Sequence, residues 1–354
     1  MPRRFAPHRT RVLRKMNENP HAVLDLRFNG RLSRELSTVF NRLSHSLRRP
    51  FNELVTCISA PHGDSIDWWV QGPASRNTLA SPFFHYFCEL HLVGYLINQG
   101  GFPFDEVRVD SRVLKRLVRK QLADALLPGV RVSYSVPAAA AWKEALKRFA
   151  GTPVFLGMKA CQFFIAGLTR NAHGPAPMPG RLVLIDTFMT AAYTTSDRWY
   201  GSLWENLTPE LKKQTAFVPT IVQTPLRALR ATYQRLRSNA RPFLIKEDYL
   251  RLSDLWFAWQ HSRRIKGTAL VPVHALGHDI SGLVAEEIAL NRDPLTTIES
   301  LLTFRFVKRL SESGVQVRLA IDWFEGQVID KAWNLGFKRY YPAAIRVGYR
   351  AFES

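Results

Sequence analysis

The chain has 354 residues, of which 46% are hydrophobic and 22% charged, so it can bury a core and lacks the composition of a disordered protein. Its formal net charge is +20 and its sequence pI is about 10.3, which favours anionic partners such as nucleic acid, anionic lipid or phosphorylated substrates. The three cysteines, Cys57, Cys88 and Cys161, have the spacing of neither a metal site nor a redox motif, as expected in a reducing compartment.

The most apolar windows, residues 79–97 and 153–168, are interrupted by polar side chains, and no apolar segment follows the basic N-terminus as in a signal peptide. We therefore expect no membrane-spanning helix. The sequence predicts a cytoplasmic protein that can also attach peripherally to the inner face of the cytoplasmic membrane.

Basic residues strongly outnumber acidic ones in residues 1–50. Residues 1–20 are expected to form a basic arm, and residues 31–49 have the apolar spacing of an amphipathic helix bordered by arginines. Two interpretations of this helix stay open. It can lie on anionic lipid, or it can pack on the protein and leave its basic face in solvent.

The next segment alternates between strand and helix patterns. This alternation is typical of an α/β fold with a doubly wound, mostly parallel, Rossmann-like sheet. The patterns G-x-G-x-x-G and G-x-x-x-x-G-K-[ST] are both missing from the sequence, so we exclude nicotinamide-dependent and P-loop enzymes. The expected elements are strands at 53–59, 65–70, 106–109 and 130–134, a buried helix at 79–97, and a basic helix at 112–127 with Asp110 and Ser111 as caps.

Asp186 follows an apolar strand at residues 181–185. Catalytic groups of α/β enzymes lie at the ends of buried strands, although a cap or turn residue is an equal alternative. The following loop contains Asp197, Arg198 and Trp199 among several hydroxyls, which suits sugar recognition; a surface turn with a core aromatic is the alternative. The preceding residues are expected to form a short helix at 138–150, a buried helix at 154–168 and a loop at 171–180.

Two histidines follow a second basic amphipathic helix, expected at residues 225–243. His274, His278 and Asp279 could form a metal or acid–base cluster, but the spacing lacks the glutamate and the helix of a zincin motif, so we expect no metal. His278 and Ser281, at a helix start, could instead bind a substrate phosphate, with capping as the alternative. The other expected elements are strands at 217–222 and 269–273 and helices at 247–260, 282–291 and 296–313.

The C-terminal segment changes its periodicity at Gly326. Before this glycine, residues 315–321 alternate as in a strand with a buried face, and after it residues 327–335 have helical spacing. A further strand is expected at 345–349, so the segment predicts strand, loop, helix, strand, with its first strand parallel inside a central sheet. Glu325 opens the helix, where the helix dipole stabilises a carboxylate.

The same segment resembles a family of bacterial surface-carbohydrate biosynthesis proteins, glycosyltransferases of the GT-B type in capsule and lipopolysaccharide pathways. The resemblance rests on W-F-E-G-Q-x-x-D-K-A, G-F, Y-P and G-Y-R-A-F between Trp323 and residue 352. Shorter matches are L-I-D-T-F at 184–188, D-R-W-Y at 197–200 and K-E-D-Y at 246–249. Three positions depart from the family pattern, where Asn, Gln and Gly are expected: Gly326, Arg350 and Ala351.

The resemblance implies a GT-B-like N-terminal half that transfers a sugar from a nucleotide-sugar donor to a lipid-linked or glycan acceptor, with no other cofactor. Such a transfer needs a carboxylate and groups that stabilise the leaving phosphate. Glu325 and Asp186 are the expected catalytic carboxylates, facing one cleft that is lined by Trp199 or Trp323. The expected substrate-binding residues are Gln327, Asp330, Lys331, Asp197, Arg198, Trp199, His278 and Ser281.

Three domain segments are expected: the basic arm and helix at 1–50, a Rossmann-like domain at 51–340, and the start of a linker or truncated second domain at 341–354. The resemblance implies a further nucleotide-sugar-binding domain, so we expect a truncated copy or one half of a split enzyme that has a second-domain protein as partner. One alternative is a non-catalytic partner of polysaccharide machinery on an anionic membrane surface. A nucleic-acid-binding protein is suggested by charge alone, and without a recognisable module we expect no nucleic-acid partner.

Overall fold

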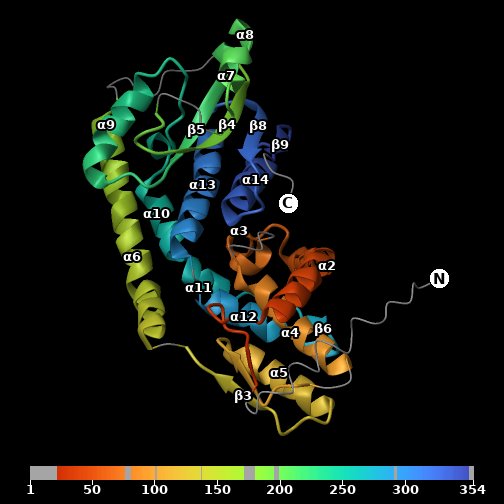
Figure 1. Ribbon diagram of the computed structural model, residues 1–354. Helices are drawn as coiled ribbons and strands as arrows, with labels where there is room; N and C mark the ends of the chain where they lie inside the picture. The colour runs from red at the N-terminus through yellow and green to blue at the C-terminus, as the bar shows by residue number, and fades with distance from the viewer. Residues whose placement is uncertain are drawn as a thin grey trace, which may run out of the picture. The chain divides into compact units, whose positions relative to one another are not determined.

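The computed structural model describes residues 22–75, 81–99, 102–136, 138–170, 180–194, 199–290 and 293–350 (Figure 1). The chain divides into two compact units. Unit 1 comprises Met1–Pro61, Thr78–Ala145 and Ala269–Leu290, and unit 2 comprises His62–Asn77, Leu146–Thr268 and Asn291–Ser354. The basic arm predicted at residues 1–20 lies outside the described residues.

Both units are built on parallel strands, so the predicted α/β class is confirmed. The division differs from the predicted segments, because residues 51–340 contribute strands to both units instead of to one domain. Strand patterns show which residues are extended, but they carry no information on which sheet a strand joins. The strand at 345–349, expected to begin a linker, pairs within the sheet of unit 2.

Unit 1 contains a three-stranded sheet of order β1-β2-β3, formed by β1 (Val23–Asp25), β2 (Glu106–Val109) and β3 (Arg131–Tyr134). Its helices are α2 (Arg34–Ser59), α4 (Pro82–Asn98), α5 (Arg112–Asp124) and α12 (Ser281–Leu290). A two-stranded hairpin, β6 (His274–Ala275) with β7 (His278–Asp279), precedes α12. The strand predicted at 269–273 is therefore wrong, because the first strand of the hairpin begins at His274.

The helix predicted at 31–49 is confirmed and is longer than expected. Its apolar spacing continues through Phe51, Val55 and Ile58, all buried, so the strand predicted at 53–59 is wrong. The stripe packs on protein: Phe51 contacts the rings of Phe83, Phe84 and Phe87 on α4. These contacts support the packed-helix interpretation.

Unit 2 is organised on a four-stranded parallel sheet of order β5-β4-β8-β9. The strands are β4 (Leu182–Met189), β5 (Thr215–Ile221), β8 (Val317–Trp323) and β9 (Ile345–Tyr349). Helix α14 (Val328–Tyr340) connects β8 to β9, and Gly326 has a φ of 77° in the turn before it. The predicted strand, loop, helix, strand order, with β8 inside the sheet, is confirmed.

The two faces of this sheet bury different sets of side chains. Leu184, Val218 and Ala320 share a core with α13 (Pro294–Glu312) and α14, and Trp333 of α14 is 1% exposed within it. The opposite face packs Ile185 and Phe217 against aromatic residues around α7 (Leu203–Asn206). The remaining elements of unit 2 are α3 (Ile66–Trp69), α8 (Pro209–Gln214), α9 (Leu226–Arg237), α10 (Leu252–Trp259), α11 (His261–Lys266) and the short 3-10 helices η1 (Ala60–His62, which begins in unit 1), η2 (Gly72–Ala74) and η3 (Lys246–Asp248). The strand predicted at 65–70 is wrong, because Ser65 caps α3 there.

Residues 138–168 form one helix, α6 (Ala138–Leu168), instead of the two predicted, and Pro153 lies inside it. Within the described residues, its portion Ala150–Leu168 is long and apolar enough to span a membrane by length and composition, although we expected no such segment. The prediction that this portion is buried is also wrong, since most of it is not buried and its buried share is only 17%.

Candidate functional site

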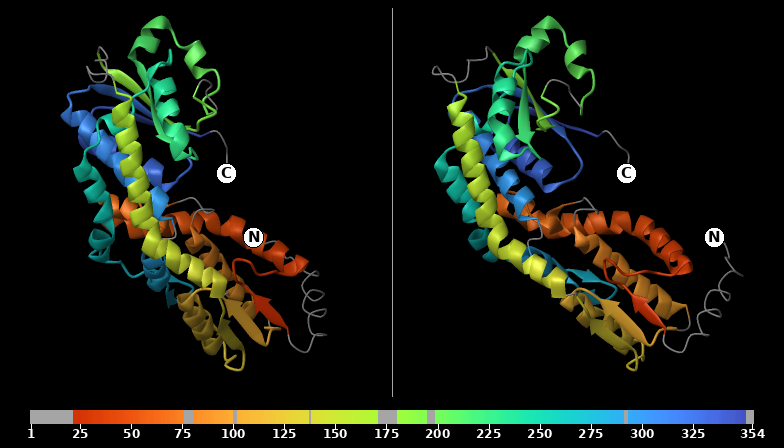
Figure 2. Two further views of the ribbon diagram at one scale, coloured as in Figure 1. Left: turned by 90° about the vertical axis from the view of Figure 1, so that its left-hand side faces the viewer. Right: turned by 60° about the vertical axis from the view of Figure 1, so that its left-hand side comes forward.

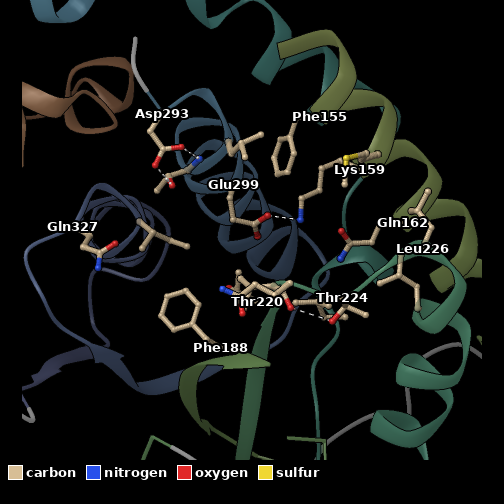
Figure 3. A pocket seen from close by; sticks show the side chains of 18 residues that line it. Phe155, Lys159, Gln162, Phe188, Thr220, Thr224, Leu226, Asp293, Glu299 and Gln327 are labelled. Atoms are coloured by element: carbon tan, nitrogen blue, oxygen red, sulfur yellow. Dashed lines mark hydrogen bonds and ion pairs between the residues drawn. The ribbon is translucent and has the colours of Figure 1, made fainter. Parts of the chain in front are cut away.

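Unit 2 contains a pocket of about 480 Å³ at the carboxyl ends of β4 and β5 (Figure 3). This is the edge of a parallel sheet where α/β proteins bind ligands, and the volume is within the usual range for small-molecule sites. Helix α6 forms one wall, and the first turns of α9, α13 and α14 contribute the others. The lining residues are Phe155, Met158, Lys159, Gln162, Phe188, Thr220, Ile221, Val222, Gln223, Thr224, Leu226, Leu229, Asp293, Leu295, Thr296, Glu299, Gln327 and Ile329.

Two buried lysines meet at one carboxylate in the pocket wall. Lys159 of α6 pairs with Glu299 of α13, and Lys246 Nζ lies 2.9 Å from the other oxygen of Glu299. Lys246 Nζ also donates to Thr220 Oγ1 at 2.7 Å and to Thr303 Oγ1 at 3.0 Å. Burial alone would raise the pKa of Glu299, but the two ammonium groups outweigh it and hold that pKa at about 2. Two amino groups thus share one carboxylate in this cluster.

Gln162, which also lines the pocket, belongs to a second polar network. Its amide nitrogen donates to the hydroxyl of Tyr233 at 2.9 Å and to Glu247 Oε1 at 2.8 Å. Burial raises the pKa of Glu247, and the nearby charge of Lys159 partly opposes this shift. These two hydrogen bonds connect α6 to α9 and to η3, and they fix the position of one pocket wall.

Asp186 lies below the pocket and does not line it. The strand predicted to end at 185 continues to Met189, so Asp186 is in the middle of β4 and is 2% exposed. Its side chain shares a face of the strand with Phe188, which does line the pocket. Burial raises the pKa of Asp186 to about 7, although the charge of Lys246 acts in the opposite direction.

Two further carboxyl groups, those of Asp322 and Asp330, interact electrostatically with Asp186. Asp322 follows Ile321, the register partner of Ile185, and is 1% exposed. Burial raises its pKa to about 9, with repulsion from Asp330 and Asp186 adding to the shift. Asn334 Nδ2 donates to Asp322 Oδ2 at 2.7 Å, while Oδ1 of Asp322 and of Asp186 are both buried without a hydrogen-bond partner. Its surroundings therefore favour the protonated form of Asp322.

The free energy of unfolding is expected to fall as the pH rises from about 4 towards 9. Asp186 and Asp322 hold their protons up to pH values of about 7 and about 9 in the folded chain, whereas the ordinary pKa of an aspartate is 3.8, so the folded state binds more protons in this window. Each unit of pKa shift corresponds to about 1.4 kcal/mol. Urea unfolding at several pH values measures the slope, and Asp322→Asn should reduce it.

Glu299 does not obscure this slope, because its lowered pKa affects stability only below about its ordinary value of 4.5. A slope that Asp322→Asn leaves unchanged would contradict the protonated state of Asp322.

Glu325 is exposed at the carboxyl end of β8. Its two oxygens accept hydrogen bonds from Trp323 Nε1 at 2.8 Å and from Gln327 Nε2 at 2.6 Å. Since Gln327 lines the pocket, Glu325 is one hydrogen bond away from the lining. Glu325 thus lies at the exposed carboxyl edge of the sheet, whereas Asp186 is buried within β4, and neither residue lines the pocket.

The other residues predicted around the start of α14 have different positions. Asp330 is buried and accepts from the backbone nitrogens of Glu325 and Gln327, so it caps the helix. The ammonium of Lys331 lies over the rings of Trp69 and Phe324, at 5.9 and 5.3 Å from their centres. Of the predicted residues at this helix start, the pocket includes Gln327 alone.

The predicted aromatic residues do not line the pocket. Trp199 and Trp323 contact each other with ring centres 5.0 Å apart, and Trp199 Nε1 donates to the backbone oxygen of Phe188 at 2.9 Å. The aromatic lining instead comes from Phe155 and Phe188. Asp197 and Arg198 lie outside the described residues.

His278 and Ser281 belong to unit 1, and the unit 2 pocket includes neither. Asp279 Oδ1 accepts from the backbone nitrogen of Ser281 at 2.9 Å, which agrees with the capping interpretation. His274 pairs with Asp279 across the hairpin. Among the residues that the structure describes, no group of three or more His, Cys, Asp or Glu side chains is arranged to hold a metal ion.

Sequence reasoning missed the charged centre of the pocket. Lys159, Lys246 and Glu299 come from three separate helices, and each pattern was interpreted on its own segment. The available signal was Lys159, a single cation within an apolar helix, because a buried lysine requires a partner. No protein-family model, curated protein or solved structure matches the chain.

Proposed function

We propose that the protein is a glycosyltransferase of bacterial surface-polysaccharide assembly, which uses the unit 2 pocket to transfer a sugar from a nucleotide-sugar donor to a lipid-linked or glycan acceptor. The observation that carries the proposal is the buried Lys159–Glu299–Lys246 cluster in a pocket at the carboxyl edge of a parallel sheet. The resemblance of the C-terminal motif to GT-B enzymes agrees with it, and the parallel strands of both units are compatible with that fold.

The pocket has the chemistry that a nucleotide sugar requires. Lys159, which lines the pocket, offers a basic group to a diphosphate, whose charge increases as the sugar leaves. Phe155, Phe188 and Ile329 offer apolar surface, while Gln162 and Thr220 supply polar groups that fix orientation. Gln223 has a φ of 50°, a conformation that is uncommon outside glycine and often occurs at functional sites.

Glu325 is assigned the role of the reacting carboxylate. It accepts the acceptor proton or stabilises the positive charge that develops on the sugar, and its hydrogen bonds to Trp323 and Gln327 fix its orientation. Asp186 is a positioning residue beneath the pocket, where its charge acts on Lys246, and Lys246 in turn holds Thr220 and Glu299. Gln327 contacts the substrate and connects the pocket with Glu325.

A bulky side chain placed in the pocket should weaken the binding of a nucleotide sugar. Thr224 lines the pocket, and Thr224→Trp should weaken binding roughly tenfold or more, since an indole occupies much of the space. Calorimetric titration with a panel of uridine, guanosine and cytidine nucleotide sugars measures the effect. Ser202→Trp is the matched control, because Ser202 is exposed and outside the pocket.

If no nucleotide sugar binds the wild-type protein, or if Thr224→Trp binds as well as Ser202→Trp does, the pocket is not the donor site. Transfer activity is then measured with the nucleotide sugar that binds, using glycan and lipid-linked acceptors.

A further inference from the structure

Helix α6 has its polar and apolar sides reversed relative to an ordinary surface helix. Lys159 and Gln162 point inward to the pocket, as Figure 3 shows, and both are 7% exposed. The outward side from residue 150 to 168 is entirely apolar or small. We call this set the α6 stripe: Pro153, Val154, Gly157, Met158, Cys161, Phe164, Gly167 and Leu168.

The α6 stripe is strongly exposed to solvent. Val154 is 59% exposed, Phe164 66% and Leu168 60%, and a Cβ added at Gly157 or Gly167 would meet no atom within 4 Å. Soluble proteins rarely leave a continuous apolar surface of this kind uncovered, so it marks an interaction surface.

Basic side chains lie on the neighbouring helix and just after α6. Helix α9 lies beside this part of α6, with Leu229, Tyr233 and Leu236 packed around Ala166 (Figures 1 and 2). The exposed side of α9 carries Arg227 and Arg230, and Arg170 follows the end of α6. An apolar stripe beside arginines is complementary to an anionic bilayer, which has an acyl interior beneath its charged headgroups.

We propose that the α6 stripe docks unit 2 on the surface of an anionic lipid bilayer, with α6 lying in the plane of the interface. The helix does not cross the bilayer, because Lys159 and Gln162 hold its inner face on the rest of unit 2 through Glu299, Tyr233 and Glu247.

Docking in this orientation brings the pocket to the membrane. Met158 belongs to the stripe and also lines the pocket, where it is 45% exposed. Leu226 and Leu295 are two further lining residues, each 47% exposed. A lipid-linked molecule could therefore pass from the bilayer to the pocket along apolar side chains. The docking itself does not depend on the proposed sugar transfer, and its test requires no turnover.

Cys161 offers a direct probe, because its thiol is exposed within the stripe. Cys88 is buried, which raises the pKa of its thiol to about 12 and protects it from labelling. A Cys57→Ser variant labelled at Cys161 with an environment-sensitive fluorophore reports on α6. The matched control is a Cys161→Ser variant labelled at Cys57, which is exposed on α2.

Both proteins are mixed with vesicles of phosphatidylcholine alone or of equal parts phosphatidylcholine and phosphatidylglycerol. The fluorescence at Cys161 should shift to the blue with the anionic vesicles, and that at Cys57 should not. Arg227→Gln with Arg230→Gln should weaken binding to the anionic vesicles roughly fivefold for each arginine.

A second pair of variants tests the apolar contribution by vesicle flotation. Val154→Ser with Leu168→Ser should reduce the bound fraction roughly tenfold or more, since two apolar side chains lose their burial in lipid. Leu252→Ser with Ile345→Ser is the control, because these residues are 70% and 65% exposed elsewhere in unit 2. Thermal unfolding of both double variants should give the melting temperature of the wild type, which checks that the fold is preserved.

Three results would overturn the proposal. The first is a Cys161 fluorophore that anionic vesicles leave unchanged. The second is a shift at Cys57 without one at Cys161, which would assign membrane binding to α2. The third is a shift at Cys161 without lipid that grows with protein concentration and accompanies a dimer in light scattering, which would assign the stripe to a second copy of the chain.

Discussion

Replacing Glu299 by glutamine is expected to lower the free energy of unfolding by about 3–5 kcal/mol. The substitution preserves the shape of the side chain but removes the only carboxylate that contacts both Lys159 and Lys246 among the described residues. Two lysines would then remain buried without the carboxylate that both of them contact. Urea unfolding, followed by tryptophan fluorescence at neutral pH, measures the loss.

Glu312→Gln is the matched control for this experiment. Glu312 also contacts basic side chains, those of Lys308, Arg309 and Arg251, but it lies at the surface with a side chain that is 38% exposed. Solvent screens such pairs, so this substitution should cost less than about 1 kcal/mol. Equal costs for the two variants would contradict the assignment of the pocket cluster as a buried charge network.

Replacing Glu325 by glutamine is expected to reduce the turnover number for sugar transfer by roughly two to four orders of magnitude. The fold should be unaffected, because Glu325 is exposed and the amide oxygen can still accept one of its two hydrogen bonds. Affinity for the nucleotide sugar should change little, since Glu325 is outside the pocket lining. Transfer kinetics together with calorimetric binding separate the two effects.

Glu205→Gln provides a comparison with another exposed carboxylate of unit 2, which pairs with Arg241. Its transfer rate should equal that of the wild type. If Glu325→Gln retains full activity while the donor still binds in the pocket, another group performs the reaction and Glu325 has only its local hydrogen bonds.

The sequence predicted the C-terminal part of unit 2 well, because each signal there is local. The change of period at Gly326 and the charged residues of the first turn of α14 depend on near neighbours, and the predicted order of elements agrees with the structure. The predicted end of the helix at Leu335 is wrong, because α14 continues through the buried Gly336 to Tyr340. Similarly, β2 was predicted with its correct limits at Glu106 and Val109, since an alternating tetrapeptide precedes a capped helix.

The errors occurred where long-range packing decides the structure. Residues 53–59 are apolar enough for a strand, but they continue the buried side of α2 past Pro50. Asp186 was expected at a strand end because the apolar run stops at Ile185, but the strand continues to Met189 and buries the carboxyl group. The pocket could not be predicted from one sequence, since Lys159, Thr220, Glu299 and Gln327 meet only after four elements pack.

The order of strands in unit 2 has a consequence for how the protein is made. On the ribosome, β4 emerges with Met189 long before β8 begins at Val317, yet β8 is its partner in the sheet. The ribosome must therefore synthesise β5, α9 and the unit 1 segment Ala269–Leu290 before the partner of one edge of β4 is available. Pairing of this kind is slow and exposes a nascent chain to aggregation. Translation at low temperature or with a holding chaperone should accordingly increase the soluble yield.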